Sequence, residues 1–227
     1  MKRFVFVLLA AVLVFQIAPA QLPFSVGGKF GINIANASLD PSLPSQLSKS
    51  GRMGFAFGGV LEMGLAGPVF LQIEPMFIQK GVKIEGPMFQ NQAGQVFTGS
   101  QKNNISYLEF PILIKAKLPT GQVKPYGFLG PALGLRLSSK QEIEVPSAGF
   151  KEESTADSTT SSMDFGLAFG AGAEFSVAPK VAVTGDVRYV LGLKDLNSGS
   201  DQPGQQHQSI KSNGIQFFVG VLFKLGK

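Results

Sequence analysis

The charged residues of this chain stand at alternate positions in runs that are otherwise apolar or glycine-rich, and this spacing limits the chemistry open to them. Carboxylates held beside cations can act as a general acid and base, or they can neutralise one another in a structural network. The residues that the alternation places on one common face are Lys29, Glu62, Glu74, Glu109, Lys115, Glu174, Asp186 and Arg188. Which chemistry applies depends on whether a substrate can reach that face.

Other candidates for chemistry are few. The single histidine, His207, follows Asp201 in a polar stretch, and such a pair can serve hydrolysis or acyl transfer, but a solvated loop histidine is the simpler interpretation. The chain has no cysteine, and no group of its residues has the ligand spacing of a zinc or calcium site. Gly170-Ala171-Gly172 is similar to a phosphate-binding turn, but no helix N-terminus follows it, and a crowded barrel interior explains its glycines better. We therefore predict no catalytic, cofactor-binding or metal-binding residues and no enzymatic activity.

The segments that carry the charged face have the two-residue period of β-strands. In one of them, Met163, Phe165 and Leu167 alternate with Asp164 and Gly166. Each such segment is long enough to supply the roughly 9–11 residues that a tilted membrane-spanning strand needs. The predicted strands are 24–34, 53–65, 69–80, 107–118, 124–137, 163–175, 181–191 and 215–225.

The gaps between these strands alternate between long and short. The long gaps are 36–51, 85–104, 139–161 and 194–211, and the short ones are 66–68, 119–123 and 177–180. Because an antiparallel strand reverses direction at each crossing, the alternation places all long gaps at one end of a barrel and all short turns at the other. Both ends of the chain then lie on the side of the short turns, which we expect to be the periplasmic side.

The N-terminus has the features of an export signal. Lys2 and Arg3 precede an apolar stretch, 4–17, which is followed by the small-residue site Ala18-Pro19-Ala20. We predict cleavage after residue 20, which divides the chain into a signal peptide, 1–20, and one β-barrel domain, 21–227. Without cysteine, the exported domain must be held together by its hydrogen-bond ladder and its packing.

The apolar face of the predicted strands carries almost no charge, and charged residues make up only 15% of the chain. The interior of an eight-stranded barrel is barely wide enough for side chains, and the other face combines glycine and alanine with a few long charged residues. These features favour charges inside and apolar side chains against lipid. We predict an all-β, eight-stranded antiparallel up-and-down transmembrane β-barrel whose lumen is closed by ion pairs. The alternative is an inverted, soluble, lipocalin-like barrel that binds a lipid.

Two local features complicate this arrangement. Pro75, Pro111 and Pro131 fall within predicted strands, and because each removes a donor from the ladder, we expect bulges there or strand segments beyond the hydrocarbon layer; Pro125 can begin a strand. Among the long gaps, Phe89 and Phe97 flank a glycine turn that predicts a hairpin above the membrane. The stretch 151–162 is rich in Ser, Thr and acidic residues and is expected to be mobile.

The sequence also limits the partners. The formal net charge is +5, but the sequence has no basic cluster interleaved with aromatic residues that could bind a phosphate backbone. A nucleic acid partner is therefore not expected. We expect a monomer surrounded by outer-membrane lipid, with contacts to envelope proteins through its long loops.

Three motifs resemble the PorT-like outer-membrane β-barrel family. They are the strand Tyr107-Leu108-Glu109-Phe110-Pro111, the strand Pro125-Tyr126-Gly127-Phe128-Leu129-Gly130-Pro131, and the segment 186–195. The resemblance spans essentially the whole mature chain. It implies a bacterial outer-membrane barrel, and the namesake members assist a protein secretion system linked to gliding. The chain departs from many outer-membrane barrels at its end, Phe223-Lys224-Leu225-Gly226-Lys227, which lacks a terminal aromatic residue.

The expected role is structural or adhesive, or that of an accessory subunit in an envelope complex, including a complex for secretion. The alternative functions are a small pore or ligand carrier, which requires an unblocked lumen, and the soluble lipid-binding barrel.

Overall fold

The computed structural model describes residues 23–40, 44–92, 94–155, 161–197 and 209–225. The predicted signal peptide, 1–20, and the pair Asp201 and His207 lie outside these ranges. No helix in the described ranges is long and apolar enough to cross a membrane.

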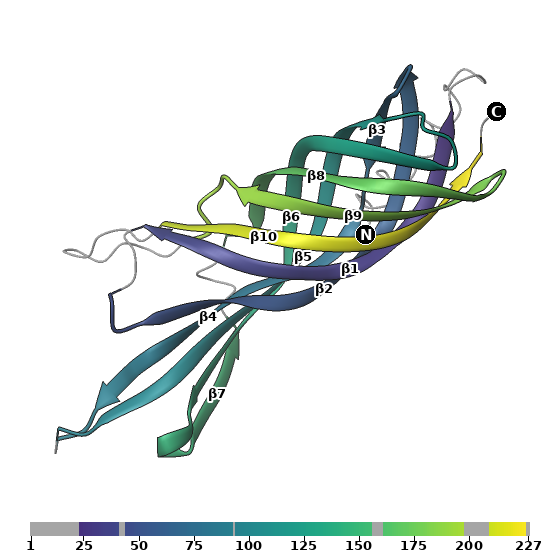
Figure 1. Cartoon of the computed structure of the whole chain (residues 1–227). Coiled ribbons are helices and arrows are strands. Elements are labelled where there is room, and N and C mark those ends of the chain that lie inside the picture. The colour runs from purple at the N-terminus through teal and green to yellow at the C-terminus, as the bar shows by residue number, and fades with distance from the viewer. Residues whose placement is uncertain (1–22, 41–43, 93, 156–160, 198–208, 226–227) are drawn as a thin grey trace, which may run out of the picture.

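The described residues form antiparallel strands that close into a ring (Figure 1). The ring runs β1, β2, β3 with β4, β5, β6, β8, β9 and β10, and β10 pairs with β1 along almost their whole lengths. This is the predicted eight-stranded up-and-down order, with one position shared by β3 and β4. The strands are β1 (Phe24–Asp40), β2 (Ser48–Ala66), β3 (Val69–Ile73), β4 (Met76–Gln90), β5 (Val96–Lys117), β6 (Val123–Val145), β7 (Phe150–Thr155), β8 (Met163–Ala178), β9 (Val181–Gly192) and β10 (Ser209–Lys224).

Proline divides the third predicted strand into β3 and β4. Pro75 has no N–H to donate, so the ladder stops at Glu74 and Pro75 and resumes at Met76. Pro111 of β5 lies opposite this break, and its carbonyl accepts a hydrogen bond of 3.1 Å from the Glu74 amide. The two prolines therefore share one interruption of the sheet.

The expectation of a bulge is wrong for Pro111 and Pro131, which stand inside continuous strands and keep a regular register with their neighbours. Pro125 is the third residue of β6 and so stands near a strand start, as predicted. The bulge in this part of the ring falls at Ser106 and Tyr107. A proline in a strand still offers its carbonyl as an acceptor, and Pro111 accepts from Glu74 at 3.1 Å while Pro125 accepts from Leu118 at 2.8 Å.

The short turns lie where the sequence predicts them, whereas large parts of the predicted long gaps form strands. β1, β4 and β6 continue past the points where the polar gaps begin, and β4 and β5 form the predicted hairpin, with Phe89 and Phe97 stacked at 4.8 Å. Gly94 in its turn has φ +81°. Residues 151–155 of the stretch that was expected to be mobile belong to β7, which pairs with β6 from Phe150 to Thr155 after the short helix η1 (Pro146–Ala148). Residues 156–160 lie outside the described ranges.

The two faces of the ring are separated as the alternation predicts. Phe57 is 51% exposed, Leu135 43% and Phe217 45%, all on the outer surface, while their neighbours Ala56 and Phe218 are buried inside. The inverted, lipocalin-like alternative is therefore wrong, since it needs these large apolar side chains around an internal cavity.

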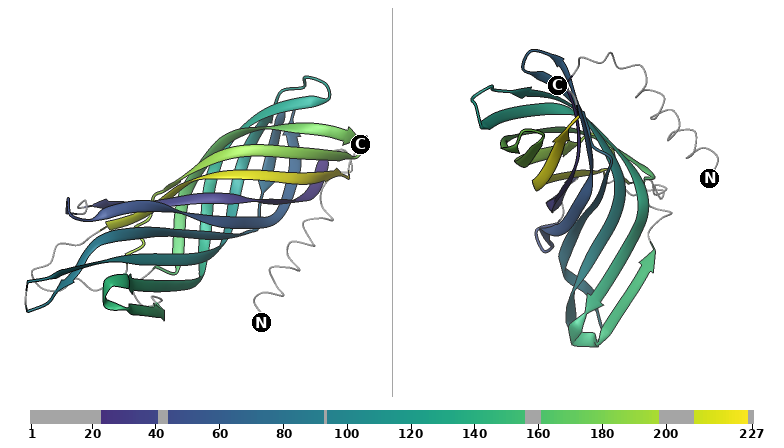
Figure 2. Two further views of the ribbon diagram at one scale, coloured as in Figure 1. Left: turned by 60° about the horizontal axis from the view of Figure 1, so that its bottom comes forward. Right: turned by 90° about the vertical axis from the view of Figure 1, so that its right-hand side faces the viewer.

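The apolar outer surface ends part of the way along β4, β5 and β6. Beyond Gln79, Ser106 and Ser138 the outward positions become polar or charged, as at Lys102 and Glu142. The parts of β4 to β6 past these points, together with β7, form a sheet that projects from the ring (Figure 2). We call residues 79–90, 96–106 and 138–155 the projecting sheet.

Glycine on the inner face makes room for large side chains. A Cβ at Gly170 would lie 2.7 Å from the ring of Phe128, and one at Gly172 would lie 2.7 Å from the ring of Tyr126. Both distances are shorter than atoms tolerate. The prediction that a crowded interior explains Gly170-Ala171-Gly172 is confirmed.

Candidate functional site

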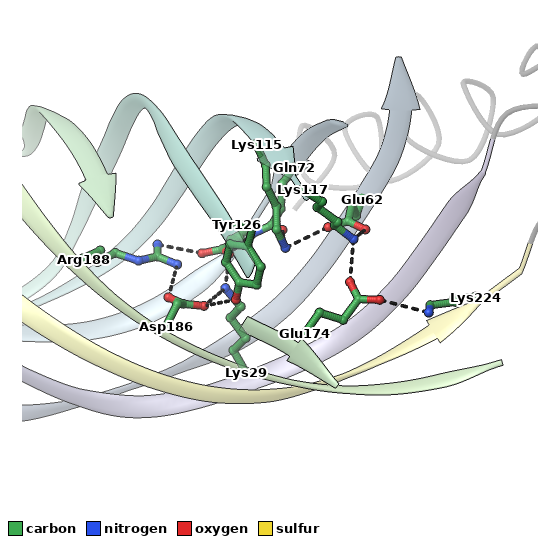
Figure 3. Close-up of polar contacts among 11 residues, drawn as sticks. Lys29, Glu62, Gln72, Lys115, Lys117, Tyr126, Glu174, Asp186, Arg188 and Lys224 are labelled. Carbon is green, nitrogen blue, oxygen red and sulfur yellow. Dashed lines mark hydrogen bonds and ion pairs between the residues drawn. The ribbon is translucent and has the colours of Figure 1, made fainter. Parts of the chain in front are cut away.

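The middle of the barrel holds four charged side chains from opposite walls, here called the central cluster. Lys29 of β1 contacts Glu74 at 2.8 Å and Asp186 of β9 at 2.7 Å. Arg188 of β9 contacts the other oxygen of Glu74 at 2.7 Å and Asp186 at 3.3 Å. The Tyr126 hydroxyl of β6 donates to Asp186 at 3.1 Å. Because its members come from strands on different sides of the ring, the cluster crosses the lumen (Figure 3).

A second group, the turn-end cluster, lies nearer the short turns. Glu62 of β2 contacts Lys115 at 2.9 Å and Lys117 at 2.5 Å, both on β5. Lys117 also contacts Glu174 of β8 at 2.6 Å, and Glu174 contacts Lys224 of β10 at 2.9 Å. These contacts form a chain of alternating charge from one wall to the other, as Figure 3 shows.

Gln72 of β3 connects the two clusters. Its side-chain oxygen accepts a hydrogen bond from Lys115 at 3.0 Å, and its amide nitrogen donates to Glu74. Gln72 is fully buried, so one continuous polar network extends from the short turns to the middle of the barrel.

A third group, the mouth cluster, lies toward the long-loop end. Lys80 of β4 contacts Glu109 of β5 at 2.6 Å and Asp164 of β8 at 3.0 Å. All three side chains are buried. The three clusters together contain six cations and six carboxylates, so the charges placed in them balance.

Aromatic rings fill the space beside the cations. The Lys115 ammonium lies 3.7 Å from the centre of the Tyr126 ring, and Arg188 lies 5.2 Å from Phe128 and 4.6 Å from Phe218. A cation over a ring face is attracted to it, more strongly where water is excluded. The interior is thus a packed mixture of ion pairs and aromatic side chains.

The structure places every predicted member of the charge network in one of the three clusters. Lys29, Glu74, Asp186 and Arg188 belong to the central cluster, Glu62, Lys115 and Glu174 to the turn-end cluster, and Glu109 to the mouth cluster. The predicted set omitted several partners, although their inward parity was visible in the sequence. These are Gln72, Lys80, Lys117, Tyr126, Asp164 and Lys224.

Charge on the projecting sheet is arranged differently, in exposed pairs. Lys102 lies 3.2 Å from both Glu142 and Glu144, and hydrogen bonds to these carboxylates raise the pKa of Lys102 above its usual value. Glu142 also contacts Lys151 at 3.3 Å, and hydrogen bonds from Lys102 and Lys151 lower its pKa. Such exposed pairs contribute little to stability, but they leave the sheet surface patterned with both signs of charge.

A closed antiparallel ring that is apolar outside and ion-paired inside defines a transmembrane β-barrel, because closure satisfies the backbone in lipid without a free edge. The sequence model of the family described as the outer membrane protein beta-barrel domain matches residues 16–198. The chain belongs to this family, and its location is the outer membrane.

None of the curated proteins compared with the chain matches it in sequence. Among solved structures, it is similar to Neisserial surface protein A, with 15% identity, coverage of 89% of this chain and 97% of the other, and a TM-score of 0.47. Outer membrane protein OprG from Pseudomonas aeruginosa gives 14% identity, 92% and 98% coverage, and a TM-score of 0.48. Ail, the attachment invasion locus protein of Yersinia pestis, gives 12% identity, coverage of 88% of this chain and 98% of the other, and a TM-score of 0.42.

Proposed function

We propose that the protein is a closed, monomeric, non-enzymatic barrel that anchors the projecting sheet outside the cell for contact with another envelope or surface molecule. The observation that carries the proposal is the network of ion pairs across the lumen. An unblocked interior would instead support a pore, and a substrate entrance would support catalysis.

The side chains of the central cluster support closure. Lys29, Glu74, Asp186 and Arg188 are buried from both ends, and each carboxylate is held by two cations. A carboxylate committed to two cations is a poor general base, since its lone pairs are already occupied. The arrangement is that of a structural plug, and the proposal assigns it no catalytic role.

The projecting sheet supports a role in contact. β7 pairs with β6 along one edge, and in the part of the chain that the structure describes its other edge is unpaired. Lys151, Glu152 and Glu153 are exposed along this strand, and charged side chains on an open edge discourage self-pairing. Phe89 and Phe97 add an aromatic pair at the hairpin. Rigid, patterned strands beyond the membrane suit recognition better than a short turn does.

The PorT-like motifs favour a second candidate, an accessory subunit of a secretion-related complex. In the structure Tyr107 and Glu109 of the first motif face the interior beside Lys80, and Pro111 occupies the shared break with Pro75. Crosslinking in intact cells, followed by purification of the barrel, distinguishes the candidates. Capture of secretion machinery supports the accessory role, and capture of none favours the anchor.

The proposal also takes residues 1–20 as a cleaved signal and 21–227 as the mature barrel. N-terminal sequencing of the protein from outer membranes tests this, with Gln21 as the expected first residue.

Conductance measurements test closure. The protein in planar bilayers is expected to show no steady single-channel current, because two clusters cross the lumen. The matched variant Glu74→Ala/Arg188→Ala removes one cation and one anion together and shortens both side chains, so it is expected to admit intermittent current. Steady current through the unsubstituted barrel, with insertion verified by protease protection in liposomes, would contradict the proposal.

A further inference from the structure

A cavity of about 250 Å³ lies at the long-loop end of the barrel, where the first part of the projecting sheet faces the ends of β1 and β10. Its walls come from β1, β4, β5, β6, β10 and residues 196–197 after β9, and they include Tyr107 and Lys80. The proposed anchoring function makes no use of this cavity.

Tyr107 lines the cavity and carries a polar group that is not used elsewhere. Its side chain is 0% exposed, and its hydroxyl has no hydrogen-bond partner among the described residues. Asp164 does not line the cavity, but it lies behind Lys80, where one of its oxygens contacts the ammonium group at 3.0 Å. A buried polar atom without a partner is costly, and a bound molecule that supplies the missing hydrogen bonds removes that cost.

Three amide side chains line the walls above Tyr107. Gln101 and Asn103 project from β5 at the inward positions, and Gln141 projects from β6. Between the described residues these three side chains form no hydrogen bond or ion pair. Each amide offers both a donor and an acceptor, which matches hydroxyl groups that also do both. Val82, Ile105 and Ile210 supply apolar surface beside them.

The charge balance of the cavity excludes a strongly ionic ligand. Lys80 is the charged side chain in the lining, and Glu109 and Asp164 already neutralise it at 2.6 and 3.0 Å. The volume falls just below the usual range of about 300–1,000 Å³ for small-molecule sites, which fits one sugar ring. We propose that this cavity binds a small uncharged polyhydroxy molecule, either a free monosaccharide or the terminal sugar of a glycan.

Titration of the full barrel with sugars tests the site. The barrel is held in phosphatidylcholine nanodiscs, because a glycoside detergent would compete with the sugars for the cavity. The probes are glucose and N-acetylglucosamine, with glucuronate and glucosamine as charged counterparts. Their binding is measured by saturation-transfer NMR. The neutral sugars are expected to bind saturably, and the charged ones about tenfold more weakly because the site offers them no free counterion. A disaccharide distinguishes the sources, because a site for a terminal sugar accepts it and a site for free monosaccharides does not.

Two variants locate the binding. Tyr107→Phe removes only the unpartnered hydroxyl and is expected to weaken sugar binding about three- to tenfold, the value of one neutral hydrogen bond; Gln141→Leu is expected to do the same. The matched control is Tyr189→Phe, whose ring lies on the outer surface 5.6 Å from Phe169 and should change nothing. Absence of saturable binding by either neutral sugar, tighter binding of a charged probe, or unchanged binding in both Tyr107→Phe and Gln141→Leu would overturn the proposal.

Discussion

Replacement of Arg188 by methionine is expected to lower the free energy of unfolding of the barrel by about 3–5 kcal/mol, the cost of removing one partner from a buried ion pair. Arg188 is fully buried and contacts both Glu74 and Asp186. Without it, Lys29 alone must neutralise two carboxylates in the middle of the barrel. Urea titration of the protein in lipid vesicles, followed by intrinsic tyrosine fluorescence or gel mobility, measures the change.

A double-mutant cycle separates the pair from the loss of packing. Arg188→Met with Glu74→Gln restores a balanced cluster, so the double variant is expected to lose less stability than the two single variants combined. The control is Glu153→Gln, which breaks an exposed pair with Lys140 on the projecting sheet and should cost less than about 1 kcal/mol. Equal losses for Arg188→Met and the exposed control would show that the central cluster contributes nothing.

Placing arginine on the outer surface at Val219 is expected to destabilise the barrel by about 2–4 kcal/mol, as for a charge at the middle of the hydrocarbon layer. Val219 is 55% exposed and lies midway along the outward apolar positions of β10, between Phe217 and Val221. Vesicle unfolding titrations measure this directly.

The control for Val219→Arg is Gln79→Arg, where the outer surface of β4 changes from apolar to polar. A charge near the interface costs about 0–1 kcal/mol. If both substitutions cost the same, the apolar surface does not end where the projecting sheet is taken to begin.

Alternation in the sequence was sufficient to predict the ring, because a period of two assigns each side chain to a face regardless of its neighbours. The same period places the apolar residues Val60 and Phe218 on the inward face, and the structure buries both. Strand length was less predictable. Polar residues mark the end of the hydrocarbon layer, but β5 and β6 continue through such residues because backbone pairing does not require an apolar side chain.

The sequence predicted which residues belong to the charge network more reliably than which of them contact one another. Parity placed Lys29 and Glu74 inside, but their contact depends on the stagger between β1 and the β3–β4 break, which the sequence pattern leaves open. Lys117 and Lys224 are the last residues of β5 and β10, and their predicted inward positions did not reveal which carboxylates they contact. The Tyr107 hydroxyl illustrates the same limit, since its lack of a partner among the described residues depends on where the side chains of neighbouring strands lie.

The arrangement of apolar side chains outside and ions inside is tested most directly by cysteine labelling. Because the chain has no cysteine, single substitutions at Phe57, Leu135 and Phe217 each give one reactive site, and Glu152→Cys on β7 provides the solvent-exposed control. The account predicts that a lipid-soluble maleimide modifies the first three in native outer membranes, while a charged, water-borne maleimide modifies only the control. Rapid modification of Phe57→Cys, Leu135→Cys and Phe217→Cys from water, with none from the lipid phase, would contradict it.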